Sequence, residues 1–374
     1  MKNITKKFIG AICALTLSAS VTVFAEAAEI FTIDKAVEYA KENSYTIETL
    51  ENNILSAKNS AESARLTQKK LKNIKNDLYM SYSGIDTTLV QRGYYYHLAQ
   101  FGHRNAQRAL ISAEYDIEAN VELAFYDYIN SKKKVAFAQE DLDKAKSRYE
   151  TAAKKYSQGS ISALELESFS LAQLNAQNAL NSAKRTQDSK LMNFKALINY
   201  PLDKELELVG TFERQPIDTT TVEEATKLFE ASVAKADLDE NFALAKEKFA
   251  SETAYYTAAK YEYYTAKATF ANAEGQYNQA LNGAKISIQT AYDNMQNLYE
   301  TLAYLDKTLE YTKAQEQAAK IRYEQGTITS NDYLDAAAQL TKMQNTIADT
   351  ELGAWNAVVS YRKLFDCKNT VFAD

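Results

Sequence analysis

The sequence predicts an all-α protein made of two tandem repeats of long antiparallel coiled-coil helical hairpins, with little or no β-structure. Three observations predict this fold class: helix breakers are scarce, apolar residues recur at helical spacing, and the second half of the chain repeats the first. Only two prolines and ten glycines occur in 374 residues. A chain so poor in breakers favours long helices, because its abundant Ala, Lys, Glu, Gln and Leu lose little freedom in a helix.

Residues 1–25 have the layout of a secretory signal peptide. A basic start is followed by an apolar stretch over residues 8–17 and by Val23-Phe24-Ala25 as a small-residue cleavage site. A retained membrane anchor is the alternative, but the stretch is short and Ser and Thr interrupt it. We therefore expect an exported protein.

Charge and cysteine content argue against several function classes. Without the signal segment, 40 basic and 49 acidic residues remain, a net charge of −9. Such an acidic chain is a poor partner for nucleic acid. Cys13 leaves with the signal and Cys367 remains alone, so neither an intrachain disulfide nor a cysteine metal site is expected.

The second half of the chain repeats the first, and Pro201 and Pro216 mark the boundary between them. With an offset of 167 residues, positions 156–162 (YSQGSIS) align with positions 323–329 (YEQGTIT). We therefore divide the chain into a first helical repeat (29–199), a proline-containing linker (200–218) and a second helical repeat (219–368).

Apolar residues in each half follow the three–four spacing of a coiled-coil helix, which keeps a seam on one side. A helix of about 50 residues is on the order of 75 Å long, so the expected shape is elongated. The segments predicted as helices are 32–79, 106–157 and 160–199 in the first half, and 221–266, 274–324 and 330–366 in the second.

Gly159 and Gly326 lie where the chain must reverse between two helices. Glycine is favoured there because it tolerates the left-handed conformation that ends many helices. A plain helix–helix turn explains each glycine, whereas its recurrence at the same place in both repeats favours a function. Candidate caps for the helix that follows are Ser160, Ser162, Thr327 and Thr329.

The order helix, connection, helix, Tyr-x-x-Gly turn, helix, given twice, resembles TolC-type outer membrane efflux proteins. The resemblance implies a TolC-like α-barrel protomer: three subunits form a hollow cylinder, and the glycine turns contact a periplasmic adaptor protein that works with an inner-membrane pump. Acidic residues past the second glycine would ring the narrow end, but the family's basic partner there falls at Ile328. By motif position, the adaptor-docking tips are Gly159, Ser160, Gly326 and Thr327, and the aperture residues are Glu165, Tyr323, Asp332 and Asp335.

Two explanations of Asp332 and Asp335 stay open. The residues are three apart, hence on one face near a helix start. Carboxylates at that place interact favourably with the helix dipole, which is sufficient to explain them. If three copies point at one axis, they would instead select cations and resist anions.

The connections between the first two helices of each half depart from the family pattern. A membrane-crossing hairpin needs two strands of about 9–11 residues each. The first connection, 80–102, holds at most a short hairpin, and the second is about 22 residues shorter. We expect a variant that lacks the full transmembrane β-barrel hairpins. Tyrosines cluster at this end, at 94–96 and 255–264; they suit a membrane or envelope contact, or equally the gaps between helices.

No catalytic, cofactor-binding or metal-binding motif stands out in the sequence. His97 and His103 are the only histidines and are expected in an exposed loop. Neither a phosphate-binding loop nor a nucleophile elbow occurs. We therefore expect neither an enzyme nor a cofactor.

Two function hypotheses follow. The leading one is an envelope component of an efflux or export system, a homotrimeric helical duct that docks to an adaptor through its glycine turns. The resemblance implies a place in the outer membrane or periplasm, or at the extracytoplasmic surface if the cell has no outer membrane. The alternative is a non-channel coiled-coil scaffold or surface interaction protein of the cell envelope. A duct requires a trimer with a wide lumen, whereas a scaffold can be a monomer or dimer, so the mass in solution separates them.

Overall fold

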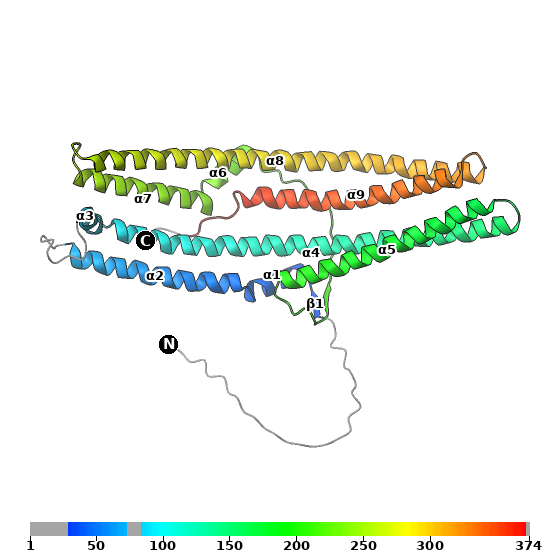
Figure 1. Ribbon diagram of the computed structural model, residues 1–374, viewed down its shortest axis with the longest axis horizontal. Helices are drawn as coiled ribbons and strands as arrows, with labels where there is room; N and C mark the ends of the chain where they lie inside the picture. The colour runs from blue at the N-terminus through cyan, green and yellow to red at the C-terminus, as the bar shows by residue number, and fades with distance from the viewer. Residues whose placement is uncertain (1–28, 73–83, 372–374) are drawn as a thin grey trace, which may run out of the picture.

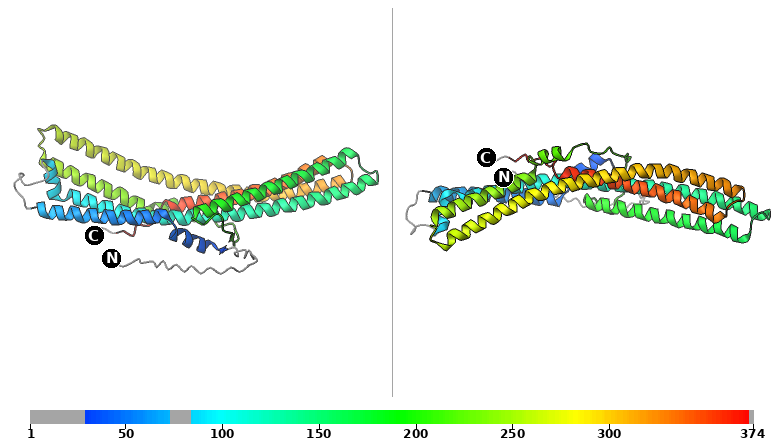
Figure 2. Two further views of the ribbon diagram at one scale, coloured as in Figure 1. Left: turned by 60° about the horizontal axis from the view of Figure 1, so that its bottom comes forward. Right: turned by 90° about the horizontal axis from the view of Figure 1, so that it is seen from above.

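The structure, a computed structural model, describes residues 29–72 and 84–371, and the signal peptide expected at 1–25 lies outside the described residues. The described chain is an elongated bundle of helices that run along one axis (Figures 1 and 2). The first half contains β1 (Glu29–Phe31), α1 (Ile33–Glu42), α2 (Tyr45–Leu71), α3 (Ile85–Arg92), α4 (Tyr94–Ser157) and α5 (Ala163–Leu197). After β2 (Leu206–Leu208), the second half contains α6 (Val222–Phe229), α7 (Val233–Tyr255), α8 (Tyr261–Glu324) and α9 (Ser330–Lys363). The predicted fold class is confirmed.

Helices α4 and α8 run the length of the rod and organise the two halves. Each has 64 residues, hence a length on the order of 95 Å. Helix α4 packs against α2 over one part of its length and against α5 over the other, while α8 packs in the same way against α7 and α9 (Figure 1). The ends of α8 follow those of α4 by 167 residues, so the duplication in sequence is also one of structure.

The single first helix predicted for each half, 32–79 and 221–266, is wrong. The structure divides the described part of the first range into α1 and α2, and the second range into α6, α7 and the start of α8. Residues 73–79 lie outside the described residues. Ser44 begins α2 by accepting a hydrogen bond from the amide of Ile47, and Ser232 begins α7 in the same way. A capping side chain satisfies an amide that would otherwise be free, which favours the start of a new helix. The short helices α1 and α6 thereby become separate elements near the middle of the rod (Figure 1).

The predicted starts of the second helices, 106 and 274, are also wrong, because α4 begins at Tyr94 and α8 at Tyr261. Gly102 and Gly275 therefore lie inside helices. Glycine inside a helix costs about 1 kcal/mol relative to alanine, and packing along the whole rod outweighs that cost. The second connection is reduced to residues 256–260, and α3 occupies part of the first.

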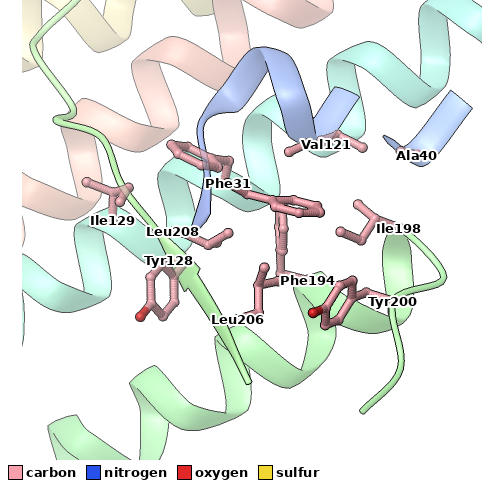
Figure 3. Close-up of a cluster of buried hydrophobic side chains, with 12 residues drawn as sticks. Phe31, Ala40, Val121, Tyr128, Ile129, Phe194, Ile198, Tyr200, Leu206 and Leu208 are labelled. Carbon is pink, nitrogen blue, oxygen red and sulfur yellow. The ribbon is translucent and has the colours of Figure 1, made fainter. Parts of the chain in front are cut away.

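Two clusters of buried side chains hold the middle of the rod. The first gathers around Phe31, Phe194 and Leu208 (Figure 3). There β1 and β2 pair in parallel, with Phe31 opposite Leu208, so the linker folds back onto the start of the first repeat. The second cluster joins α6, α8 and α9 and includes Met295 and Tyr361. These strands and short helices thicken the rod at its middle.

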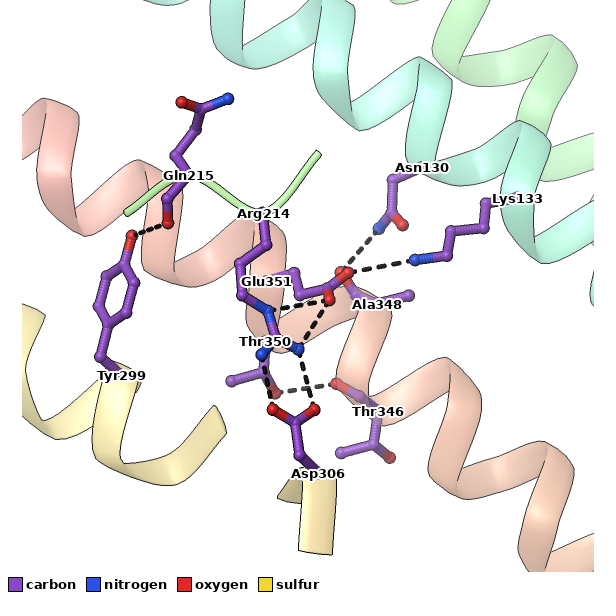
Figure 4. Close-up of polar contacts among 10 residues, drawn as sticks. All are labelled: Asn130, Lys133, Arg214, Gln215, Tyr299, Asp306, Thr346, Ala348, Thr350 and Glu351. Carbon is purple, nitrogen blue, oxygen red and sulfur yellow. Dashed lines mark hydrogen bonds and ion pairs between the residues drawn. The ribbon is translucent and has the colours of Figure 1, made fainter. Parts of the chain in front are cut away.

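Polar contacts join the two halves where α4 and α9 run between the middle of the rod and the glycine turns. Figure 4 shows these contacts. Arg214 of the linker donates to Asp306 on α8 at 2.6 and 3.0 Å and to Glu351 on α9 at 2.9 and 3.2 Å. Lys133 on α4 pairs with Glu351 at 3.2 Å. The amide of Asn130 on α4 donates to a backbone carbonyl of α9 at 3.2 Å. These bonds set how α4, α8 and α9 lie along one another.

On the other side of the middle, α4 is joined to α7. Arg108 is 1% exposed and pairs with Asp237 at 2.6 Å and with Glu240 at 2.5 Å. Nearer the end of the rod, the Nδ1 atom of His97 lies 2.8 Å from a carboxylate oxygen of Glu247. The expectation of a loop is wrong for both histidines, because His97 and His103 lie within α4.

Candidate functional site at the glycine turns

Both glycine turns end their helices in the same way. The φ angle is 69° at Gly159 and 71° at Gly326, in the left-handed region that glycine adopts without strain. The amides of Gly159 and Ser160 donate to the carbonyls three and five positions earlier, both at 2.9 Å. The amides of Gly326 and Thr327 do the same at 3.0 and 2.9 Å. This pair of bonds is the Schellman motif, which satisfies carbonyls at a helix end.

The second helix of each hairpin begins at a side-chain cap. Ser162 accepts from the amide of Glu165 at 3.1 Å, and Thr329 accepts from the amide of Asp332 at 3.2 Å. Of the four predicted candidates, these two are the caps, and the other two lie in the turn itself. The hydrogen bonds that shape each turn and its cap therefore all join residues within a few positions of one another.

The two turns lie at the same end of the rod (Figure 1), and a groove of about 910 Å³ runs between them. Ser160 and Glu165 line it from the first hairpin, and Tyr323 and Gly326 from the second. Leu164, also on the groove, is 81% exposed. The structure thus brings four of the eight predicted site residues to one groove.

Tyr323 joins the two hairpins inside this groove. Its phenol donates to Glu165 at 3.0 Å, and its ring packs on Phe169 at 5.7 Å and stacks on Tyr333 at 5.6 Å between centroids. The ammonium of Lys155 lies 4.9 Å from the centroid of the same ring. Burial, together with the nearby Glu165 carboxylate, raises the pKa of Tyr323 to about 12. The phenol therefore stays protonated at neutral pH and remains a donor.

Arg148 on α4 makes a second link behind the tip. Its Nε donates to the hydroxyl of Tyr333 at 2.9 Å, its Nη2 donates to Glu316 at 3.2 Å, and the guanidinium lies 4.8 Å from the Tyr333 ring centroid. One residue thereby ties α4 to both α8 and α9. The sequence-based site omitted Arg148 and Tyr333. A signal existed, because Arg148 is a charged residue three positions from Ala145 in the apolar seam.

The two aspartates lie outside the groove between the tips. The Asp332 carboxylate accepts from the amide of Thr329 at 3.0 Å and from its hydroxyl at 2.7 Å, which completes a capping box. These hydrogen bonds lower the pKa of Asp332. Asp335 is exposed and borders a separate groove of about 540 Å³, together with Arg148. In the single chain, Asp332 therefore has the local role at a helix start.

The end of the rod opposite the glycine turns carries the tyrosine clusters. Residues 94–96 are half-buried, whereas Tyr261 and Tyr264 are 80% and 59% exposed. The first cluster fills gaps between helices and the second forms surface. Among the described residues, no group of three or more His, Cys, Asp or Glu could hold a metal ion. In the same ranges, no helix combines the length and apolar character needed to cross a membrane.

Comparisons with known proteins agree with this architecture. Residues 255–364, which include the second glycine turn, match the family model described as outer membrane efflux protein. The CmeC outer membrane channel of Campylobacter jejuni has a TM-score of 0.68 at 13% identity, covering 91% of this chain and 87% of its own. The outer membrane protein VceC of Vibrio cholerae has a TM-score of 0.70 at 12% identity, and the match covers 89% of this chain and 95% of VceC. CusC has a TM-score of 0.71 at 11% identity, and the match covers 89% of this chain and 91% of CusC.

No curated protein matches the sequence. At 11–13% identity, the solved structures establish a shared fold alone. Together with the family match, they confirm the resemblance to TolC-type outer membrane efflux proteins that the repeated glycine turns indicated.

Proposed function

We propose that this chain is the protomer of a helical duct in the cell envelope, a TolC-like component of an efflux or export system. The observation that carries the proposal is that both glycine turns lie at one end of a long rod and are linked there by Tyr323 and Glu165. Such a protomer can line a passage with its long helices and close it with its tips. The matched family is described as outer membrane efflux protein, and we propose no catalytic activity.

The tips are the proposed docking surface for a periplasmic adaptor protein, which would connect the duct to an inner-membrane pump. Gly159, Ser160, Gly326 and Thr327 form the two turns, and Ile161 and Ile328 border the groove between them. This groove has a mostly polar lining with a few exposed apolar side chains, and it lies between two rigid turns. It suits a helical tip of a partner, because the turns need no reordering on binding.

The aperture is the proposed role of Glu165, Tyr323, Asp332 and Asp335. Tyr323 and Glu165 hold the two hairpins of one protomer together, which corresponds to a closed tip. The position where the family carries a basic residue is Ile328, and in this chain Lys155 and Arg148 supply the cations beside the two tyrosines instead. Assembly of several copies would bring the Asp332 and Asp335 carboxylates into a ring.

The mass of the mature protein in solution, measured by light scattering, tests the duct. We expect a trimer. The assembled protein should bind a small trivalent cation such as hexamminecobalt(III) in preference to a small anion, measured by calorimetry, and Asp332→Asn with Asp335→Asn should reduce that preference. A trimer whose ion preference is unchanged by the double substitution would remove the role of the aspartates and leave the duct intact.

A coiled-coil scaffold of the envelope is the second candidate. It is favoured by the end opposite the glycine turns, where residues 256–260 join α7 to α8 directly and α3 lies beside α7. The same light-scattering measurement separates the two, because a scaffold is compatible with a monomer or dimer and a duct is not.

Export and the division into repeats belong to the same proposal. Residues 1–25 would be removed, so the N-terminus of the mature protein, read by sequencing, should lie close after Ala25. We place the mature protein in the outer membrane or periplasm, with repeats at 29–199 and 219–368 around the linker at 200–218.

A further inference from the structure

One face of α4 carries the contacts between the two halves. Toward the glycine turns, Asn130 and Lys133 reach α9. Toward the other end, His97 and Arg108 reach α7. These positions are separated by close to whole numbers of helical turns, so they lie along one side of the helix.

The corresponding face of α8 is open in the single chain. Position by position, α8 repeats α4 at an offset of 167 residues. Phe137 on α4 is half-buried, whereas Tyr304, which takes its place on α8, is 69% exposed. Large side chains in a row along one face favour contact with a partner. The exposed ones on this face are Tyr261, Tyr264, Ile286, Tyr304 and Tyr311, at 80%, 59%, 67%, 69% and 64%.

The chain also contains helices that could cover the exposed face of α8 in a second copy. Within the protein, α9 and α7 cover α4, and their repeats in the first half are α5 and α2. A second copy can therefore lay its α5 and α2 on α8 as α9 and α7 lie on α4. The outer sides of α5 and α2 carry exposed apolar residues too, among them Leu174 at 57% and Leu55 at 59%.

An ion pair within the chain supports this arrangement. At the corresponding positions of the other repeat the two charges are exchanged, so the positions again carry opposite charges. The pair between Lys133 and Glu351 joins α4 to α9 at 3.2 Å. At the offset of 167 residues, Glu300 takes the place of Lys133 and Lys184 takes the place of Glu351. Both are exposed, and neither has an ion-pair partner within residues 29–72 and 84–371.

A second correspondence lies near the tyrosine-rich end. His97 contacts Glu247 on α7. Tyr264 takes the place of His97, and Asn59 takes the place of Glu247 when α2 and α7 are aligned on their capping serines. Asn59 borders a groove of about 540 Å³ between α2, α3 and α4, whose lining is mostly polar side chains and tyrosines, with Ala64 and Val90. A phenol and an amide at these places can form a hydrogen bond.

We infer that a second copy of this chain covers the exposed face of α8, with Lys184 of one copy against Glu300 of the next and Tyr264 in the groove at Asn59. The inference rests on the proposed function, which needs copies side by side, and adds the surfaces and the pair that join them. The contact is heterologous, because the α8 face of one copy meets the α5 and α2 face of another, so each copy has two neighbours.

The contact falls into two patches on either side of the middle of the rod. There, Tyr126 and Trp355 pack edge to face within the chain. Their counterparts, Asp293 and Asp188, are both acidic and would repel each other. One patch is therefore centred on Glu300, Tyr304 and the pair with Lys184, and the other on Tyr264.

Cross-linking in a Cys367→Ser background tests the inference, with a short bis-maleimide acting on the assembled protein. Lys184→Cys with Glu300→Cys in one chain should give covalent dimers and larger multiples, and the two single variants, mixed, should give dimers only. Lys133→Cys with Glu351→Cys is the matched control, which should link within one chain and leave its mass unchanged.

The outcomes separate this inference from the proposed function. If the wild-type chain is oligomeric by light scattering but the Lys184 and Glu300 positions give no link between chains, the contact is wrong and the duct stands. If the wild-type chain is a monomer at every concentration, both are wrong.

Charge reversal gives a second measurement. Lys184→Glu alone and Glu300→Lys alone should each raise the dissociation constant of the assembly about tenfold, because attraction becomes repulsion. The two together should restore it to within about threefold. Arg185→Glu makes the same change of charge on a neighbouring face of α5 and should have no effect. If the double variant weakens assembly as much as the single variants do, Lys184 and Glu300 do not form an ion pair between copies.

Discussion

Tyr323 on α8 donates a hydrogen bond to Glu165 on α5 across 3.0 Å, so the last turn of one long helix is fastened to the first turn of a helix in the other half. The two residues are 158 positions apart in the chain. Around this bond, Phe169 and Tyr333 enclose the ring of Tyr323. The tips of the two hairpins therefore behave as one unit in the single chain.

Tyr323→Phe should loosen the tips and leave the rest of the rod intact. The ring keeps its packing, but Glu165 loses its donor, which should lower the free energy of unfolding by about 1 kcal/mol. Hydrogen exchange should become faster at residues 159–169 and 323–333. Tyr45→Phe removes an exposed hydroxyl from α2, far from the tips, and serves as the control. Equal exchange at the tips in wild type and Tyr323→Phe would contradict the link.

Arg148→Met should be more costly than an ordinary surface substitution. It removes the charged donor to Tyr333 and the ion pair with Glu316, so we expect a loss of about 2 kcal/mol in urea denaturation. Combined with Tyr333→Phe, it should show a coupling energy of about 1 kcal/mol. Lys146→Met, at an exposed position on the same helix, should change little. Strict additivity of the Arg148 and Tyr333 substitutions would show that the bond contributes nothing.

Gly326→Ala should destabilise the second hairpin because of its backbone conformation alone. No atom lies within 4 Å of a Cβ built there, yet φ is +71°. An L side chain in the left-handed region costs about 1–2 kcal/mol. Gly283→Ala, inside α8 and equally open, should instead stabilise the protein by about 0.5–1 kcal/mol. Thermal melts of the two variants should therefore shift in opposite directions.

Asp218 should make stability depend on pH in the acid range. Burial opposes its charge, but the amide and hydroxyl of Thr220 and the guanidinium of Arg362 outweigh burial and lower the pKa of Asp218. A lowered pKa contributes stability above the unfolded value, near 3.9, and that stability is lost as the pH falls through the folded value. Asp218→Asn should cost about 1.5 kcal/mol at pH 7.

Urea denaturation of wild type and Asp218→Asn at several pH values measures this effect. The difference in stability between the two proteins should narrow as the pH falls below about 4. Asp203→Asn, at an exposed position of the linker, is the control. A difference that stays constant down to low pH would mean that the ionised carboxylate is not what stabilises this contact.

The sequence by itself determined the helical rods, their duplication and the reversal of both hairpins at Gly159 and Gly326. These features are local: apolar spacing sets a helix face, and only glycine adopts a φ near +70° without strain. The sequence did not predict that new helices begin after Ser44 and Ser232. Serine occurs throughout the chain, and packing decides which serine becomes a cap.

Only the tertiary structure decided which polar residues meet. Spacing places Glu165, Tyr323 and Arg148 on their helices, but it leaves open how far each rod slides and turns against its neighbours. That register brings Tyr323 to Glu165 and Arg148 to Tyr333, and it leaves Asp332 to its local cap. The same packing lets β2 pair with β1. The linker sequence has no alternation of apolar and polar residues long enough to have predicted this strand. Contacts between residues more than 150 positions apart depend on the packing of whole helices, and a period read along one helix carries no information about its neighbour.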